Sequence, residues 1–123
     1  AVISSGGIEA IERPAPPTEL TDEESYEWLA VVNRLPADWF PRETHGLLVQ
    51  YCRHVVAARR VAQLLDDMTE KDEINVSDYD RLLKMQEREG RALSSLATRM
   101  RLSQQALVNH KTQKPDSVRK PWD

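Results

Sequence analysis

The stretch from Leu47 to Leu65 constrains the fold of this chain more than any other segment. Apolar residues recur in it at steps of three and four, which is the spacing of one continuous helical seam. These residues are Leu48, Tyr51, Val55, Ala58, Ala62 and Leu65. A second apolar stripe follows the first half of the run and contains Val49, Cys52 and Val56. A helix that is apolar on two sides needs more than one partner to cover it.

The composition suits a charge-rich helical protein. The chain has 123 residues, of which 40% are apolar and 30% charged, and it contains only four glycines. This length corresponds to about one domain, and the composition argues against a mainly β fold. No apolar run approaches the ~20 residues that cross a bilayer, and no signal peptide is recognisable, so we expect no membrane partner. Cys52 is the only cysteine, which excludes a disulfide within one chain and favours a reducing cytosol.

Capping signals predict where the helices begin. Thr21 and Glu24 form a capping box before a helix at 22–34, which Pro36 ends. The two aromatic residues of the linker that follows are expected to fill a helix junction.

Two longer helices follow the linker. Pro41 suits the first position of a long helix at 42–68. After a polar, acidic turn, Ser77 and Asp80 resemble a second capping box, before a third helix at 78–100. The sequence therefore predicts an all-α fold with a short N-terminal helix and a central antiparallel hairpin of two long helices.

The ends of the chain differ in composition from this helical part. Residues 1–20 are rich in proline and glycine and predict a flexible N-terminal arm. Residues 21–108, including one more helical turn after Ser103, form the predicted helical oligomerisation domain. Residues 109–123 form a basic tail that we expect to be flexible.

The residues that carry catalysis or bind metals are scattered. There is no phosphate-binding glycine loop and no dinucleotide-binding fingerprint. Cys52 and His54 lie on divergent helix faces, and His45 does not share a face with His54. The acidic residues around the turn lack the regular alternation of a calcium loop and are expected to be a solvated helix end. We therefore expect no catalytic residue, no metal, no cofactor and no enzymatic activity.

Charge is distributed unevenly along the chain. Residues 1–50 carry nine acids and three bases, residues 51–100 carry nine of each, and residues 101–123 carry two acids and five bases. Such a difference suggests separate partners for the two ends, although solvation of flexible ends explains it equally well.

Three basic groups are candidates for binding the phosphates of DNA. The first, here called the basic stripe, follows the third predicted helix at steps of three and four and contains Arg81, Lys84, Arg88 and Arg91. The alternative for the basic stripe is a solvated face with the helix pairs Asp80–Lys84 and Glu87–Arg91. The second group, Arg53, Arg59 and Arg60, could bind phosphate or pair with acids of a neighbouring subunit. The tail supplies the third group, Lys111, Lys114, Arg119 and Lys120.

The apolar surface of the long helix predicts self-association. A two-helix hairpin covers only one of its two stripes, so either the N-terminal helix, through Trp28, or a neighbouring chain covers the other. Gly90 could let another helix approach closely or could be a tolerated flaw. The predicted contacts between subunits are Leu48, Tyr51, Cys52, Val55 and Val56.

Two short motifs resemble a known family. The segment Leu48-Val49-Gln50-Tyr51-Cys52, and the segment Leu96 to Ser103, are similar to the small subunits of tailed-bacteriophage terminases, in particular the P27-like group. The second segment resembles the family pattern L-A-x-x-L-G-L-S/T, with Met100 and Arg101 where leucine and glycine are usual.

The resemblance implies a non-enzymatic DNA-packaging factor in the cytoplasm of the host cell. Such a protein forms a homo-oligomeric ring, binds double-stranded viral DNA and regulates the large subunit, which carries the ATPase and nuclease. The family offers no catalytic residues, and the separate helix-turn-helix domain of many members is not recognisable here. The alternative is a helical adaptor or scaffold that binds protein only.

Overall fold

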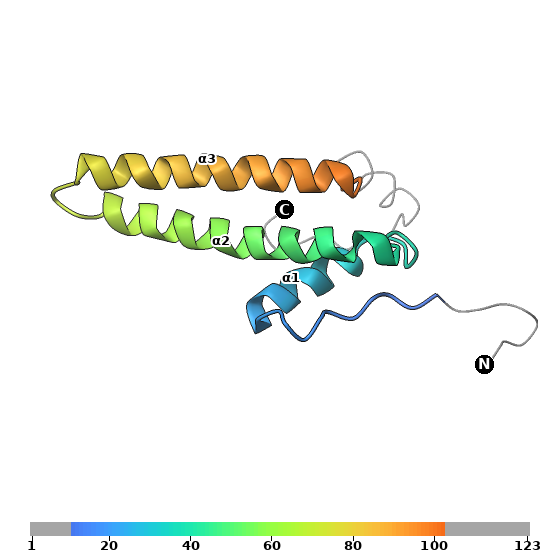
Figure 1. The fold of residues 1–123 in the computed structure, drawn as a ribbon. Helices are drawn as coiled ribbons and strands as arrows, with labels where there is room; N and C mark the ends of the chain where they lie inside the picture. Colours follow the sequence, from blue (N-terminus) through green and yellow to red (C-terminus); the bar gives the residue numbers. More distant parts are fainter. Residues whose placement is uncertain (1–10, 103–123) are drawn as a thin grey trace, which may run out of the picture.

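The computed structural model describes residues 11–102, and this part of the chain is all-helical, as the sequence predicts (Figure 1). Helix α1 spans Asp22–Val32, a 3-10 turn, η2, spans Arg42–Thr44, α2 spans His45–Thr69 and α3 spans Val76–Arg99. No strand occurs within residues 11–102, and none of these helices is long and apolar enough to cross a membrane. The helical turn expected after Ser103 and the basic tail lie outside the described residues.

The capping box of α1 is confirmed. The Thr21 hydroxyl accepts a hydrogen bond from the Glu24 backbone N–H at 3.2 Å, and the Glu24 carboxylate accepts one from the Thr21 N–H at 3.0 Å. The capping box predicted at the start of α3 is wrong. Asn75 caps this helix instead, because its side-chain oxygen accepts from the Asp78 N–H at 3.0 Å, so α3 begins two residues earlier than predicted.

Helices α2 and α3 lie side by side and run in opposite directions (Figure 1). The less exposed residues of α2 on the side of α3 recur at steps of three and four: Leu47, Tyr51, His54, Ala58, Val61, Leu65 and Met68. Those of α3 and its C-cap follow the same spacing, apart from one step of seven between Leu82 and Glu89: Tyr79, Leu82, Glu89, Leu93, Leu96 and Met100. His54 Nδ1 lies 2.5 Å from Glu89 Oε1, so a polar pair fixes the register between the two helices.

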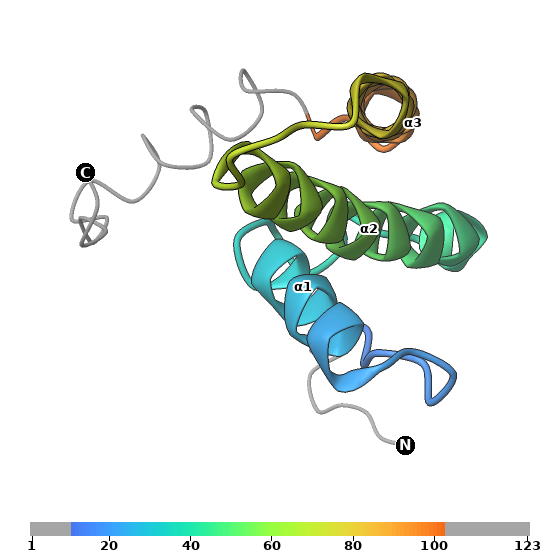
Figure 2. The ribbon, with the colours of Figure 1, turned by 90° about the vertical axis from the view of Figure 1, so that its left-hand side faces the viewer.

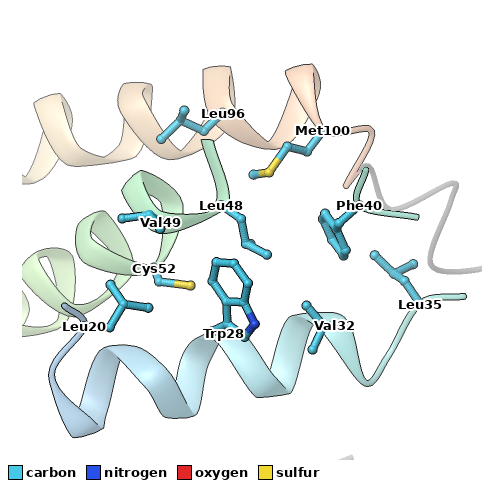
Figure 3. Packing of buried hydrophobic residues seen from close by; sticks show 10 residues of the cluster. All are labelled: Leu20, Trp28, Val32, Leu35, Phe40, Leu48, Val49, Cys52, Leu96 and Met100. Carbon is cyan, nitrogen blue, oxygen red and sulfur yellow. The ribbon is translucent and has the colours of Figure 1, made fainter. Parts of the chain in front are cut away.

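Helix α2 lies between α1 and α3 (Figure 2). The indole of Trp28 points from α1 towards Leu48 and Cys52 of α2 and is fully buried (Figure 3). The cluster around it draws on every helix and on the linker, and contains Leu20, Val32, Leu35, Phe40, Val49, Leu96 and Met100. Phe40 is buried in this cluster and Trp39 packs against it, so the linker aromatics do fill a junction between helices.

The two halves of α2 have different surroundings. Contacts of α1 extend along α2 from His45 to Arg59. The ring centres of His45 and Trp28 lie 5.8 Å apart in an edge-to-face arrangement. Beyond Arg59, α3 is the helix that covers α2; there Val61 and Leu65 are buried, whereas Leu64 is 52% exposed. The molecule therefore has a three-helix half around Trp28 and a two-helix half towards the turn at residues 70–75.

Residues 13–20 belong to the folded part, so the prediction of a flexible arm is wrong for them. The Arg13 guanidinium donates to the carbonyls of Val32 at 2.9 Å and Leu35 at 3.0 Å, where the end of α1 leaves acceptors unsatisfied. The carbonyl of Pro14 accepts from the Trp28 indole N–H at 2.8 Å. Buried polar groups need such partners, and this segment supplies one for the buried indole.

The chain reverses direction after α3. Arg101 has a φ of 58°, in the left-handed region, and the N–H of Leu102 donates to the Ala97 carbonyl at 2.7 Å. The Trp39 indole N–H donates to the Met100 carbonyl at 3.0 Å, and the Arg101 guanidinium lies 4.7 Å from the centre of the Trp39 ring. These contacts hold the end of α3 against the linker and offset part of the cost of a left-handed arginine.

Candidate nucleic-acid interface

The basic stripe lies on the exposed side of α3. Its residues fall between the positions that pack on α2, and the side chains of Arg81, Lys84 and Arg91 are 72%, 69% and 76% exposed. Arg88 is also exposed. From Arg81 to Arg91 the basic stripe covers ten residues, or about 15 Å at the helical rise of 1.5 Å per residue. The helix therefore places four basic side chains in one row that a phosphate backbone could reach.

Acidic side chains on α3 reduce the charge of the basic stripe. Lys84 Nζ lies 3.1 Å from Asp80, Arg91 lies 3.5 Å from Glu87, and Arg81 lies 3.9 Å from Asp78. The two helix pairs predicted from the sequence are thus present. Exposed pairs of this kind contribute about 0–1 kcal/mol, so they exchange readily for a stronger anionic partner.

Arg88 differs from its neighbours in the basic stripe. It enters no ion pair with the rest of residues 11–102, whereas each of the other three bases has an acidic neighbour. A phosphate bound at Arg88 would displace no carboxylate. Arg88 is therefore the member of the basic stripe whose charge is most available to an anion.

Two members of the second basic group, Arg53 and Arg59, pair with acidic residues of α1 and of the segment before it. Arg59 donates hydrogen bonds to Glu27 at 2.8 Å and to Glu23 at 3.0 Å, and these bonds raise its pKa above the ordinary value. The Arg53 guanidinium lies 3.9 Å from Glu19 and from Glu24. Arg53 and Arg59 thus find within one chain the acidic partners that the sequence could also place on a neighbouring subunit.

The predicted interface residues of α2 differ in exposure. Leu48, Cys52 and Val56 are fully buried within a single chain, so the prediction that they contact a neighbouring subunit is wrong for these three. The physical reason is that α1 and its linker cover the second apolar stripe and also pack on Leu48 of the first. Tyr51 and Val55 are half-buried and keep part of their surface for another contact.

Gly90 is surrounded by open space. A methyl group built on it would meet nothing within 4 Å, so within the described part of the chain no helix approaches closely there. The approach of a helix from another chain at Gly90 stays a prediction.

The histidines of the described part serve the fold. The ring of His45 lies 3.1 Å from the Phe40 carbonyl, and His54 binds Glu89. Within residues 11–102, no group of three or more His, Cys, Asp or Glu side chains is arranged to hold a metal ion. The contact between His54 and Glu89 was missed from the sequence, although both positions follow the three-and-four spacing of their helices.

The burial of Cys52 predicts that its thiol reacts slowly at neutral and mildly alkaline pH. Burial, with smaller contributions from Glu27 and Glu24, raises the pKa of its thiol from 9.0 to about 12. Because only the thiolate reacts, we expect a thiol-specific reagent at pH 8 to label the folded chain about a thousand-fold more slowly than the unfolded chain. Equal labelling rates with and without denaturant would contradict the burial of this thiol.

The same pKa shift predicts how stability changes in alkali. The unfolded chain releases the thiol proton near pH 9, whereas the folded chain holds it up to about pH 12. The contribution of the neutral thiol to stability is therefore present below pH 9 and is lost as the pH rises from about 9 to 12. Denaturant midpoints measured across this range, with Cys52→Ala as the control that lacks the group, check this expectation.

The four basic residues predicted in the tail, Lys111, Lys114, Arg119 and Lys120, lie outside the described residues. Comparison of the chain with protein families, with curated proteins and with solved structures finds no significant match.

Proposed function

We propose that the chain is the small terminase subunit of a tailed phage, a DNA-packaging factor without enzymatic activity. It binds double-stranded viral DNA, assembles into a homo-oligomeric ring in the host cytoplasm and regulates the large subunit. The observation that carries this proposal is the basic stripe, which presents four exposed bases in one row on α3. Contacts with phosphates of this kind provide affinity that does not depend on base sequence.

The positions of the two family-like motifs support the proposal. Leu48 and Cys52 of the first motif are both fully buried beside Trp28, so this motif is part of the core. In the second motif, Arg101 stands where the family pattern has glycine, and it adopts a left-handed conformation that favours glycine. The motif thus coincides with a turn for which a glycine would be the ordinary choice.

Assembly strengthens a weakly charged surface. A single copy of the basic stripe carries four bases beside three acids, Asp78, Asp80 and Glu87, and the affinity for DNA rises steeply with the number of phosphates contacted. A ring repeats the basic stripe in every subunit around one axis. The hairpin of α2 and α3 is the assembling unit in this proposal.

Apolar residues of that hairpin are available for contacts between subunits. In the two-helix half, Leu64, Leu83 and Met85 are 39–52% exposed, and burial of such surface contributes about 25 cal/mol per Å². Tyr51 and Val55 retain part of the surface that the sequence assigned to the interface. A mass measurement of the native assembly tests this step, and a monomer at all concentrations would contradict the ring.

A charge reversal tests the DNA contact. We expect the double variant Lys84→Glu and Arg88→Glu to leave the assembly intact and to weaken binding to a double-stranded DNA fragment. The slope of log affinity against log salt should become shallower by about 0.9 for each phosphate that the variant no longer binds. Fluorescence anisotropy at several salt concentrations measures both effects.

The matched control for this experiment is the pair Arg42→Glu and Lys71→Glu, which makes the same charge change at two exposed positions away from the basic stripe. Unchanged affinity in the variant Lys84→Glu and Arg88→Glu would eliminate the basic stripe as the contact surface. If the test variant and the control lose DNA affinity to the same extent, the affinity depends on net charge alone and not on the basic stripe.

A second candidate function is that of a helical adaptor that binds protein only. The ion pairs along the basic stripe and the exposed leucines of the two-helix half favour it. An adaptor predicts no measurable binding to DNA at low salt, whereas the terminase proposal predicts binding that falls steeply as salt rises.

A further inference from the structure

A hollow lies where the end of α1 and the residues that follow it, the first third of α2 and the short segment after α3 meet. Val31, Arg34, Leu35, Tyr51 and Leu102 line it, so its wall is apolar apart from one guanidinium and one phenol. The space inside it amounts to about 40 Å³. Pockets for small molecules measure about 300–1,000 Å³, so this hollow suits a side chain better than a ligand.

The backbone after α3 runs to the edge of this hollow. The left-handed turn at Arg101 and the hydrogen bond from Leu102 to Ala97 direct the backbone away from the axis of α3. The side chain of Leu102 then forms part of the wall. The segment that follows therefore starts at the rim of the hollow.

The first apolar residues after Leu102 lie within reach. The sequence Ser103-Gln104-Gln105-Ala106-Leu107-Val108 contains one large apolar pair, and residues 109–117 contain no Val, Ile, Leu, Met or aromatic residue. Leu107 is five positions after Leu102, which corresponds to about 8 Å in a helix and about 17 Å in an extended chain.

We propose that residues 103–108 fold back onto the chain they belong to and insert Leu107 into this hollow. A segment tethered five residues away has a far higher effective concentration than any partner in solution. Trp122 is a poorer occupant because the longer loop to it costs more entropy to close. This docking does not depend on DNA binding. It would fix the start of the basic tail beside α1 and α2.

A disulfide placed between the segment and the hollow tests the proposal in the full chain. We expect Val31→Cys with Leu107→Cys to form a bond within one chain, in oxidised glutathione, at least ten times faster than the control pair Val31→Cys with Val118→Cys. Cys52 competes poorly in both, because burial raises the pKa of its thiol to about 12.

The products of this reaction decide the outcome. Equal rates for the two pairs would overturn the proposal, and so would bonds that form only between chains, because the occupant would then be the segment of a second copy. Thermal unfolding gives an independent measurement. Leu107→Ser should lower Tm by a few degrees and Val118→Ser should leave it unchanged, whereas equal Tm values would overturn the docking.

Discussion

Replacing Trp28 with alanine is expected to destabilise the fold by about 3–5 kcal/mol. The indole is fully buried between α1 and α2, and its N–H is bonded to the Pro14 carbonyl. The substitution leaves a cavity bordered by Leu48, Cys52 and Val32 (Figure 3) and removes the donor that holds residues 13–20. Because a domain of this size is stable by only about 5–15 kcal/mol, the variant should lose about a fifth of its stability or more.

Chemical denaturation followed by circular dichroism measures this loss. The matched control is Tyr26→Ala, because Tyr26 is an aromatic residue on the same helix that is 70% exposed. We expect this control to change stability by no more than about 0.5 kcal/mol. Similar midpoints for the two variants would show that α1 does not pack on α2 through Trp28.

The substitution Val56→Asp is expected to be as damaging for a different reason. Val56 is fully buried on the side of α2 that α1 covers, and a carboxylate there has no partner and no water. An uncompensated buried charge costs about 3–5 kcal/mol. We therefore expect the variant to lose its far-UV helical signal or to unfold well below the midpoint of the parent chain.

The matched control for Val56→Asp is Val55→Asp, at the preceding position of α2. Val55 is only half-buried, so the carboxylate of Val55→Asp can reach water, and we expect a cost of about 1 kcal/mol to the single chain. In an assembled ring the same charge should disrupt a contact at Val55 and lower the native mass. The opposite order of damage, with Val55→Asp unfolded and Val56→Asp folded, would reverse the assignment of the two faces of α2.

Local signals in the sequence were sufficient to predict the helices. The box of Thr21 and Glu24 identifies the start of α1, because both partners lie within four residues of each other. Apolar spacing identified α2 and α3 for the same reason. The start of α3 was missed because two capping residues, Asn75 and Ser77, lie two positions apart, and only the folded chain shows which one caps the helix.

Contacts between distant segments were harder to predict. The sequence shows that α2 is apolar on two sides, but it does not show whether α1 or a second chain covers Cys52 and Val56. The outcome depends on hydrogen bonds that Arg13 and Trp28 form between residues 13–20 and the part of the chain around α1. The partners of these bonds are 14 to 22 positions apart in the sequence. The exposure of the basic stripe, by contrast, follows from its spacing alone, because it falls opposite the apolar side of α3.

The two-helix half beyond Arg59 has a consequence for how this protein can vary. Its register is set by His54 and Glu89 and its packing repeats every seven residues, while the cluster around Trp28 lies at the other end. Seven residues could therefore be removed from or added to each helix of this half without changing the three-helix half. Each such step would alter the length of the projection by about 10 Å. The reach of this part of the molecule is thus a property that can change while the cluster around Trp28 stays the same.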